Sequence, residues 1–240
     1  MSKCRLWLQI AWAALSSRSN QVFYDRIASI YDQVFVDHRV HALAITEELF
    51  RLYSTKEKDT RVLDLGCGTG MMSTLLADSG FSVFGLDVSL ESLKLLHQKK
   101  TNMPVLQADA EYLPIADGSL TAVVCLGVWR HFADPLKVLS EISRVLSGDG
   151  VVVIGYFPPA IAGAIHLQKG IGKGLVTFFY HLLIRKLGYV DRVDLLLEEE
   201  TIKAVRKSYV RVDKICSGGH WHLIFAKYPI RESITSDANF

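Results

Sequence analysis

The chain has 240 residues, half of them hydrophobic, which is enough to bury a sizeable core and predicts one main domain. With 27 basic and 25 acidic residues its formal net charge is +2, so it lacks the strongly basic surface that nucleic-acid phosphates require, and we expect no nucleic-acid partner. The four cysteines lie far apart and form no Cys-x-x-Cys pair, which argues for a reducing compartment and against a metal site.

Residues 1–20 form an apolar and basic segment that we separate from the main domain. The first 24 residues contain Lys3, Arg5 and Arg18 but no acid, around an apolar stretch from Leu6 to Leu15. Four interpretations stay open: a secretory signal, a transit peptide, an interfacial membrane helix, or a plain helix packed on the domain. The stretch is too short to span a bilayer. The expected location is the cytoplasm, with peripheral membrane association as an option and the mitochondrion as the alternative.

The most informative stretch, residues 61–87, reads RVLDLGCGTGMMSTLLADSGFSVFGLD. An apolar run stops at Gly66, a glycine-rich turn extends to Gly70, and a helical pattern leads to a second apolar run that ends in Asp87. Glycines let a ligand approach the main chain, and the helix after them offers unpaired N–H groups. A carboxylate about 20 residues on lies where doubly wound sheets hold ribose hydroxyls, so Asp87 is the expected ribose ligand.

This unit resembles motif I and the acidic ribose position of the class I S-adenosylmethionine-dependent methyltransferases. The resemblance implies S-adenosyl-L-methionine as cofactor and a three-layer, Rossmann-like α/β fold. Its sheet would be mostly parallel and seven-stranded, with an antiparallel last strand and an apolar helical insertion after the fifth strand. The methyltransferase domain would occupy residues 21–228, before a polar tail at 229–240. The implied cofactor-binding residues are Asp64, Gly66, Cys67, Gly68, Gly70, Asp87, Val88, Asp109, Ala110 and Leu126.

Strand and helix patterns continue to alternate downstream. We expect further strands at 104–106, 121–126, 151–154, 209–215 and 221–227. Ser89 is expected to cap the next helix, and Asp134 with Pro135 the one that ends near Gly148. The run QADAEYLPIADGS resembles the family segment whose first acid approaches the adenine amino group, which implies that role for Asp109 and Ala110. Thr121 departs from the family's aspartate before the fourth strand.

Residues 22–35 predict an amphipathic helix, because Ile27 and Ile30 fall on one helical face. The segment resembles the start of the ubiquinone and menaquinone C-methyltransferase group, where this helix covers the pocket, and Tyr24 and Tyr31 become lid candidates. His131 follows the fourth strand, and ligands of open α/β sheets bind at such strand ends. It is the leading candidate for a general base, with Tyr31 second.

The expected function is methyl transfer to a small apolar molecule: a quinone precursor, another isoprenoid or an aromatic metabolite. Residues 158–190 support an apolar substrate or a membrane contact, because they are rich in aliphatic and aromatic side chains with basic residues between them, although a helical cap on the core would have the same composition. One alternative is N-methylation of a phospholipid headgroup. Another, of a different class, is a non-catalytic scaffold or sensor that binds the cofactor. The acceptor atom and the oligomeric state are not predicted.

Overall fold

The computed structural model describes residues 3–34, 38–53, 60–100, 102–156, 203, 211–218 and 221–227. The predicted apolar insertion at 158–190 and the polar tail at 229–240 lie outside these residues. Within the described part of the chain, no helix has both the length and the apolar character needed to cross a bilayer.

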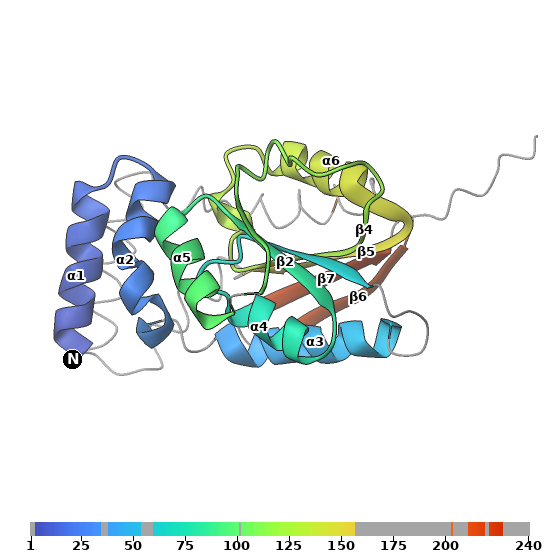
Figure 1. The fold of residues 1–240 in the computed structure, drawn as a ribbon, viewed down its shortest axis with the longest axis horizontal. Coiled ribbons are helices and arrows are strands. Elements are labelled where there is room, and N and C mark those ends of the chain that lie inside the picture. Colours follow the sequence, from blue (N-terminus) through green and yellow to red (C-terminus); the bar gives the residue numbers. More distant parts are fainter. Residues whose placement is uncertain are drawn as a thin grey trace, which may run out of the picture.

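A single sheet, with strand order β3-β2-β1-β4-β5-β7-β6, forms the centre of the molecule (Figure 1). Strands β1 to β5 pair in parallel, whereas β7 pairs antiparallel with both β5 and β6. This confirms the predicted Rossmann-like α/β fold with a parallel sheet. The strands are β1 Arg61–Leu65, β2 Ser82–Asp87, β3 Val105–Gln107, β4 Leu120–Leu126, β5 Leu146–Tyr156, β6 Arg211–Gly218 and β7 Trp221–Lys227.

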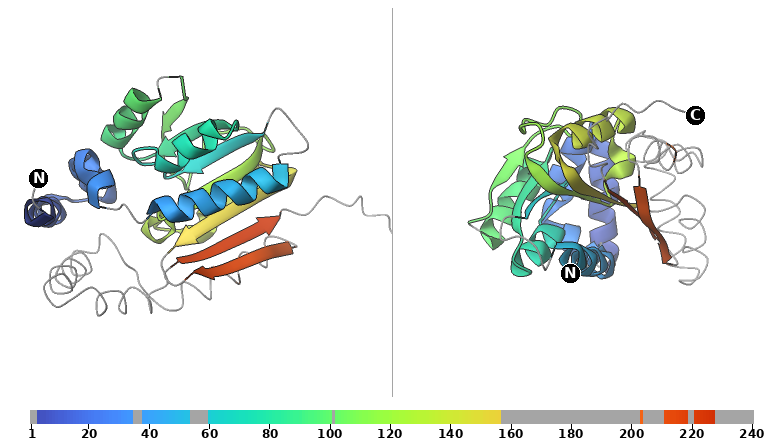
Figure 2. Two further views of the ribbon diagram at one scale, coloured as in Figure 1. Left: turned by 90° about the horizontal axis from the view of Figure 1, so that it is seen from below. Right: turned by 90° about the vertical axis from the view of Figure 1, so that its right-hand side faces the viewer.

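Helices cover both faces of the sheet (Figures 1 and 2). Helix α6 packs on one face against Leu63, Val123 and Val152, while α3, α4 and α5 pack on the other against Val62 and Val124. Neighbouring residues of one strand point to opposite faces, and both faces are buried, which explains the continuous apolar runs in the sequence. The helices are α1 Lys3–Ser16, α2 Asn20–Val34, α3 His38–Tyr53, α4 Met71–Asp78, α5 Leu90–Lys99 and α6 Pro135–Val145, with a short 3₁₀ helix, η1, at Trp129–His131.

The first two helices form a separate pair beside the sheet (Figure 1). Leu6 and Ile10 of α1 are buried against Phe23 and Ile27 of α2, in a cluster distinct from the two cores that flank the sheet. The apolar segment near the amino terminus therefore folds as a helix that packs on α2.

Strand β5 begins earlier than its sequence pattern predicts. Helix α6 ends at Val145 rather than near Gly148, and Leu146 already pairs with Leu120 of β4. The next pair is Val151 with Ala122, so residues 147–150 bulge out of the register. The physical reason is that the side chain of Leu146 is buried in the core, which keeps its backbone beside β4.

Candidate cofactor-binding site

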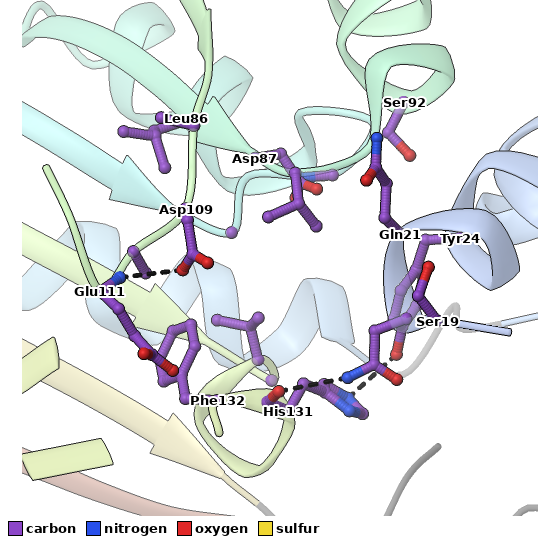
Figure 3. Close-up of a pocket in the computed structure, with 18 of the residues that line it drawn as sticks. Ser19, Gln21, Tyr24, Leu86, Asp87, Ser92, Asp109, Glu111, His131 and Phe132 are labelled. Carbon is purple, nitrogen blue, oxygen red and sulfur yellow. Dashed lines mark hydrogen bonds between the residues drawn. The ribbon is translucent and has the colours of Figure 1, made fainter. Parts of the chain in front are cut away.

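A cavity of about 310 Å³ lies at the carboxyl ends of β1, β2 and β4, with α2 along one side (Figure 3). Its position is the one that open α/β sheets use for ligands. Nine of the twelve predicted site residues line it: Tyr31, Gly66, Gly68, Asp87, Val88, Asp109, Ala110, Leu126 and His131. The other lining residues are Ser19, Asn20, Gln21, Tyr24, Leu86, Ser92, Ala108, Glu111, Gly127, Val128, Phe132 and Ala133.

The glycine-rich loop is held against β2 and turns its main chain toward the cavity. The amides of Gly66 and Cys67 both donate to the carbonyl oxygen of Leu86, at 2.7 and 3.1 Å. Gly68 has a φ of 52° and lines the cavity, and a Cβ at this position would meet no heavy atom within 4 Å. The loop therefore leaves open space next to its backbone, as a site that receives a ligand against the main chain requires.

Asp87 joins the glycine loop to the turn after β2. Its Oδ2 accepts from the amide of Gly68 and its Oδ1 from the amide of Ser89, each at 2.8 Å. Burial raises the pKa of this carboxyl, and the hydrogen bonds from the two amides oppose that rise. Each carboxylate oxygen has a second lone pair, so Asp87 can also accept from the hydroxyls of a ribose in the cavity.

Two further acidic residues line the cavity. Asp109 and Glu111 line the cavity with Asp87, and the Oδ1 of Asp109 accepts from the Glu111 amide at 3.0 Å (Figure 3). No lysine or arginine is found among the described lining residues. This excess of carboxylates over lysine and arginine along the cavity wall suits a ligand that carries positive charge, such as a sulfonium compound with an amino group.

Two aspartates of α2 attach this helix to the cofactor side of the site. Asp25 accepts from the hydroxyl of Ser89 at 2.7 Å and from the amide of Glu91 at 3.1 Å, at the start of α5. Asp32 accepts from the Thr69 hydroxyl in the glycine loop and from Lys99 Nζ at 2.6 Å. These bonds hold α2 beside the cavity, which is where the resemblance to the quinone methyltransferases places a lid.

Tyr31 extends from α2 into the cavity, close to the ribose position. Burial raises the pKa of its phenol, and the negative charges of Asp87 and Asp32 raise it further. The phenol therefore stays protonated near neutral pH and acts as a hydrogen-bond donor, so Tyr31 is poorly suited to the role of general base.

His131 connects η1 to the start of α2. Its Nε2 lies 2.9 Å from the hydroxyl of Tyr24, and its carbonyl oxygen accepts from Asn20 Nδ2 at 3.2 Å (Figure 3). Behind it the Trp129 side chain is buried and its ring meets that of Phe132 edge-on, at 5.6 Å between centroids. Figure 3 shows His131 and Asp87 at opposite ends of the cavity, and the imidazole meets the Tyr24 ring edge-on, at 5.4 Å between centroids.

Three predicted cofactor-binding residues do not line the cavity: Asp64, Cys67 and Gly70. Asp64 points to the opposite face of β1 from Leu63 and accepts from the Ser73 hydroxyl of α4. Cys67 is a free, buried thiol, and burial raises its pKa. Asp64 thus links β1 to α4, and Cys67 packs in the core on that side of the sheet.

The sequence-based prediction missed the turn between α1 and α2 and the first residues of α2, which contribute Ser19, Asn20 and Gln21 to the cavity. A signal was present. Ser19 is a favoured residue before a helix, and its hydroxyl accepts from the amide of Val22 at 3.3 Å. That signal marks where α2 begins but does not show that the turn lies next to His131.

Asp64 gives a testable pH dependence. Burial raises the pKa of this carboxyl, 2% exposed, to about 7, against about 3.9 in an unfolded chain. Between these values the folded state binds the extra proton, so wild-type stability falls as pH rises from 4 to 7. Asp64→Asn removes this loss, and from pH 5 to 8 the variant should gain about 2–3 kcal/mol relative to wild type in urea unfolding.

The control for this experiment is Asp117→Asn, which removes one negative charge from a side chain that is 78% exposed. A difference between Asp64→Asn and wild type that stays constant across this pH range would contradict the assignment of a raised pKa to Asp64.

Comparisons with known proteins agree with this geometry. A family model described as "Methyltransferase domain" matches residues 63–154. An uncharacterised protein of Methanocaldococcus jannaschii is 35% identical over 191 residues, which cover 78% of this chain and 69% of that protein. A demethylmenaquinone methyltransferase of Renibacterium salmoninarum is 33% identical over 150 residues, which cover 60% of this chain and 62% of that enzyme.

The fold also matches solved structures. The crystal structure of a proposed S-adenosyl-L-methionine-dependent methyltransferase from Methanococcus maripaludis superposes with a TM-score of 0.65 at 18% identity, over 91% of this chain and 97% of that one. The family's cofactor fits the cavity, where Gly68, Asp87 and Asp109 could hold the adenosine and the three carboxylates suit the positive sulfonium. The chain belongs to the class I S-adenosyl-L-methionine-dependent methyltransferases.

Proposed function

We propose that this chain transfers the methyl group of S-adenosyl-L-methionine to a small apolar acceptor, an aromatic quinone precursor. The observation that carries the proposal is that the two ends of one cavity differ in chemistry. Main-chain and carboxylate groups at Gly68, Asp87 and Asp109 form one end, and Tyr24 with His131 forms the other. A cofactor and an acceptor can thus be held end to end, which in-line transfer requires.

The cofactor, when bound, supplies a methyl group on a sulfonium sulfur, which is already reactive toward a nucleophile. The protein's part is to align the acceptor and exclude water, which can recover about 7–11 kcal/mol of the barrier. Helix α2 serves both purposes, because Asp25 and Asp32 hold it beside the cavity. The acceptor gives up a proton as its new bond to the methyl carbon forms, and we assign that proton to His131 Nε2.

An apolar, aromatic acceptor is supported by the apolar side chains that line the cavity. Leu126, Val128, Phe132 and Ala133 line the same cavity as the Tyr24 and His131 pair. A hydroxylated aromatic ring would place its ring against these side chains and its hydroxyl near the imidazole. The name of the Renibacterium salmoninarum relative points to the same substrate class, although this chain spans 62% of that enzyme.

The decisive test has two stages. Titration calorimetry should show saturable binding of S-adenosyl-L-methionine. Incubation with trideuteromethyl-labelled cofactor, a reduced prenylated naphthoquinone, a benzoquinol, a catechol and phosphatidylethanolamine should then label an aromatic product, identified by mass spectrometry. Label in the phospholipid would replace the acceptor class by the headgroup alternative. Cofactor binding without any labelled product would favour the scaffold or sensor.

His131 and Tyr24 should affect turnover rather than cofactor binding. His131→Ala removes the proposed base, and kcat should fall about 100-fold because general-base catalysis typically contributes at least this much. Tyr24→Phe removes the 2.9 Å hydrogen bond to the imidazole, and we expect a smaller loss with a shifted pH profile of kcat. Steady-state kinetics with the acceptor found above provide the measurement.

The matched control is His97→Ala, since this histidine is exposed in the last turn of α5 and does not line the cavity. Dissociation constants for the cofactor should stay within about twofold of wild type in all three variants, because none of them lies at the end that holds Asp87. If His131→Ala turns over as fast as His97→Ala, the imidazole is not the base.

A further inference from the structure

Helix α1 carries apolar side chains on two opposite faces. Its inner face buries Leu6, Ile10 and Ala13 against α2, which accounts for that side of the helix. A surface helix that needed only this contact would present polar residues on its outer face. The composition of the outer face therefore needs a separate explanation.

The outer face carries Leu8, Trp12 and Leu15, which we call the docking stripe. These residues are spaced four and three apart and so share one side of the helix. Their exposed fractions are 65, 62 and 60%, among the largest for apolar residues in the described part of the chain. In Figure 1, α1 is the outermost helix, with α2 between it and α5.

Basic side chains surround the docking stripe. Arg5 is exposed on the same helical side, one turn before Leu8, and Arg18 is exposed just after the end of α1. The guanidinium of Arg26, from α2, lies 5.1 Å from the centre of the Trp12 ring. Residues 3–24 contain no acid. The nearest one along the chain, Asp25, is directed to the start of α5 through its bonds to Ser89 and Glu91.

We propose that the docking stripe inserts into the interface of an anionic lipid membrane, with the three arginines on its headgroups. Trp12 and the two leucines match the apolar side of an interfacial helix, and exposed arginines beside them match its charged border. A second copy of this chain fits less well. A symmetric contact through the docking stripe would bring the arginines of both copies together, with no acid in residues 3–24 to pair them.

This position would place the cavity near the membrane surface. The turn that follows α1 contributes Ser19 to the cavity wall, and α2, which packs on α1, contributes Asn20, Gln21 and Tyr24. An apolar acceptor dissolved in the bilayer would then enter beside the docked helix. The entry of an acceptor from the bilayer rests on the proposed function, whereas membrane docking itself requires neither cofactor nor acceptor.

The test is co-sedimentation of the full chain with phosphatidylcholine vesicles, with and without phosphatidylglycerol, in the absence of cofactor. The parent should bind the anionic vesicles at least about tenfold better than the neutral ones, and should lose this preference at high salt. The triple variant Leu8→Gln, Trp12→Gln, Leu15→Gln should lose at least about tenfold in partition coefficient. The double variant Arg5→Gln, Arg18→Gln should show a similar loss in partition coefficient.

Two control proteins keep the result specific. The first control removes three exposed apolar residues outside the docking stripe, by the substitutions Phe50→Gln, Leu90→Gln and Leu136→Gln. The second removes two exposed basic residues outside α1 and α2, by Arg61→Gln and Lys94→Gln. Both controls should bind vesicles as the parent does, and every variant should keep the parent's circular dichroism and cofactor affinity.

The proposal would be overturned if the parent protein did not bind anionic vesicles, or if it bound neutral vesicles equally well. It would also be overturned if the docking-stripe variant bound as the parent does. So would a parent dimer in sedimentation velocity that this variant converts to a monomer. Vesicle binding without methyl transfer would leave docking intact and refute the proposed function.

Discussion

Replacing Asp87 with alanine is expected to weaken S-adenosyl-L-methionine binding by at least about 100-fold, because two charge-assisted hydrogen bonds to the ribose would be lost. The change would also leave the amides of Gly68 and Ser89 without their acceptor, so the glycine loop would lose its link to the turn after β2. Titration calorimetry measures the affinity, and urea unfolding of the same protein measures the accompanying loss of stability.

Asp134→Ala is a close control for this variant. Asp134 also accepts hydrogen bonds from two backbone amides, those of Leu136 and Lys137 at 3.1 Å each, but it does so at the start of α6 and is not among the residues that line the cavity. The Asp134→Ala substitution should lower the free energy of unfolding by about 1 kcal/mol, as the loss of a helix cap does, with no change in cofactor affinity. The cofactor affinity of Asp87→Asn should lie between those of Asp87→Ala and Asp134→Ala, since the asparagine keeps one acceptor oxygen. A folded Asp87→Ala protein with wild-type affinity would remove Asp87 from the site.

The parts of the fold that sequence predicted well depend on chemistry between near neighbours. Ser89 caps α5 by accepting from the Ser92 amide, and Asp134 caps α6, both as predicted. The strand that ends in Asp87 was also predicted correctly. In each case the residue types that define the feature lie within one helical turn or one strand of each other, so a short window of sequence contains the whole signal.

The parts that sequence did not predict depend on contacts between distant segments. Nothing near Asp25 indicates that it meets Ser89, so the place of α2 along the cavity could come only from resemblance to a family. Helix α3 was not predicted, although its buried Ala42, Ile45 and Leu49 have helical spacing that could have indicated it. The direction of Asp64 also had a signal, because its neighbours Leu63 and Leu65 must point to the opposite face of β1.

The glycine loop is a further case that sequence alone did not resolve, because its glycines have different structural roles and the motif does not distinguish them. Gly68 lines the cavity with open space beside it, whereas Gly70 does not line the cavity and lies against α5. A Cβ on Gly70 would come within 2.1 Å of Leu96 Cδ1 and 2.9 Å of its Cγ. Leu96 is fully buried, so it cannot move aside without repacking the core. We infer that Gly70 serves packing, and Gly68 the approach of the ligand.

Gly70→Ala is accordingly expected to lower the free energy of unfolding by about 2–5 kcal/mol, from left-handed backbone strain at a φ of 86° plus overpacking against Leu96. Gly80→Ala isolates the first contribution, because Gly80 has a φ of 92° and open space for a Cβ, and should cost about 1–2 kcal/mol. Urea unfolding at one pH measures both. Leu96→Ala in the Gly70→Ala background makes room for the new methyl group, so the double variant should be at least about 1 kcal/mol more stable than the sum of the two single losses predicts. Equal losses for Gly70→Ala and Gly80→Ala, or strict additivity with Leu96→Ala, would show that the steric contact with α5 is not what requires glycine at this position.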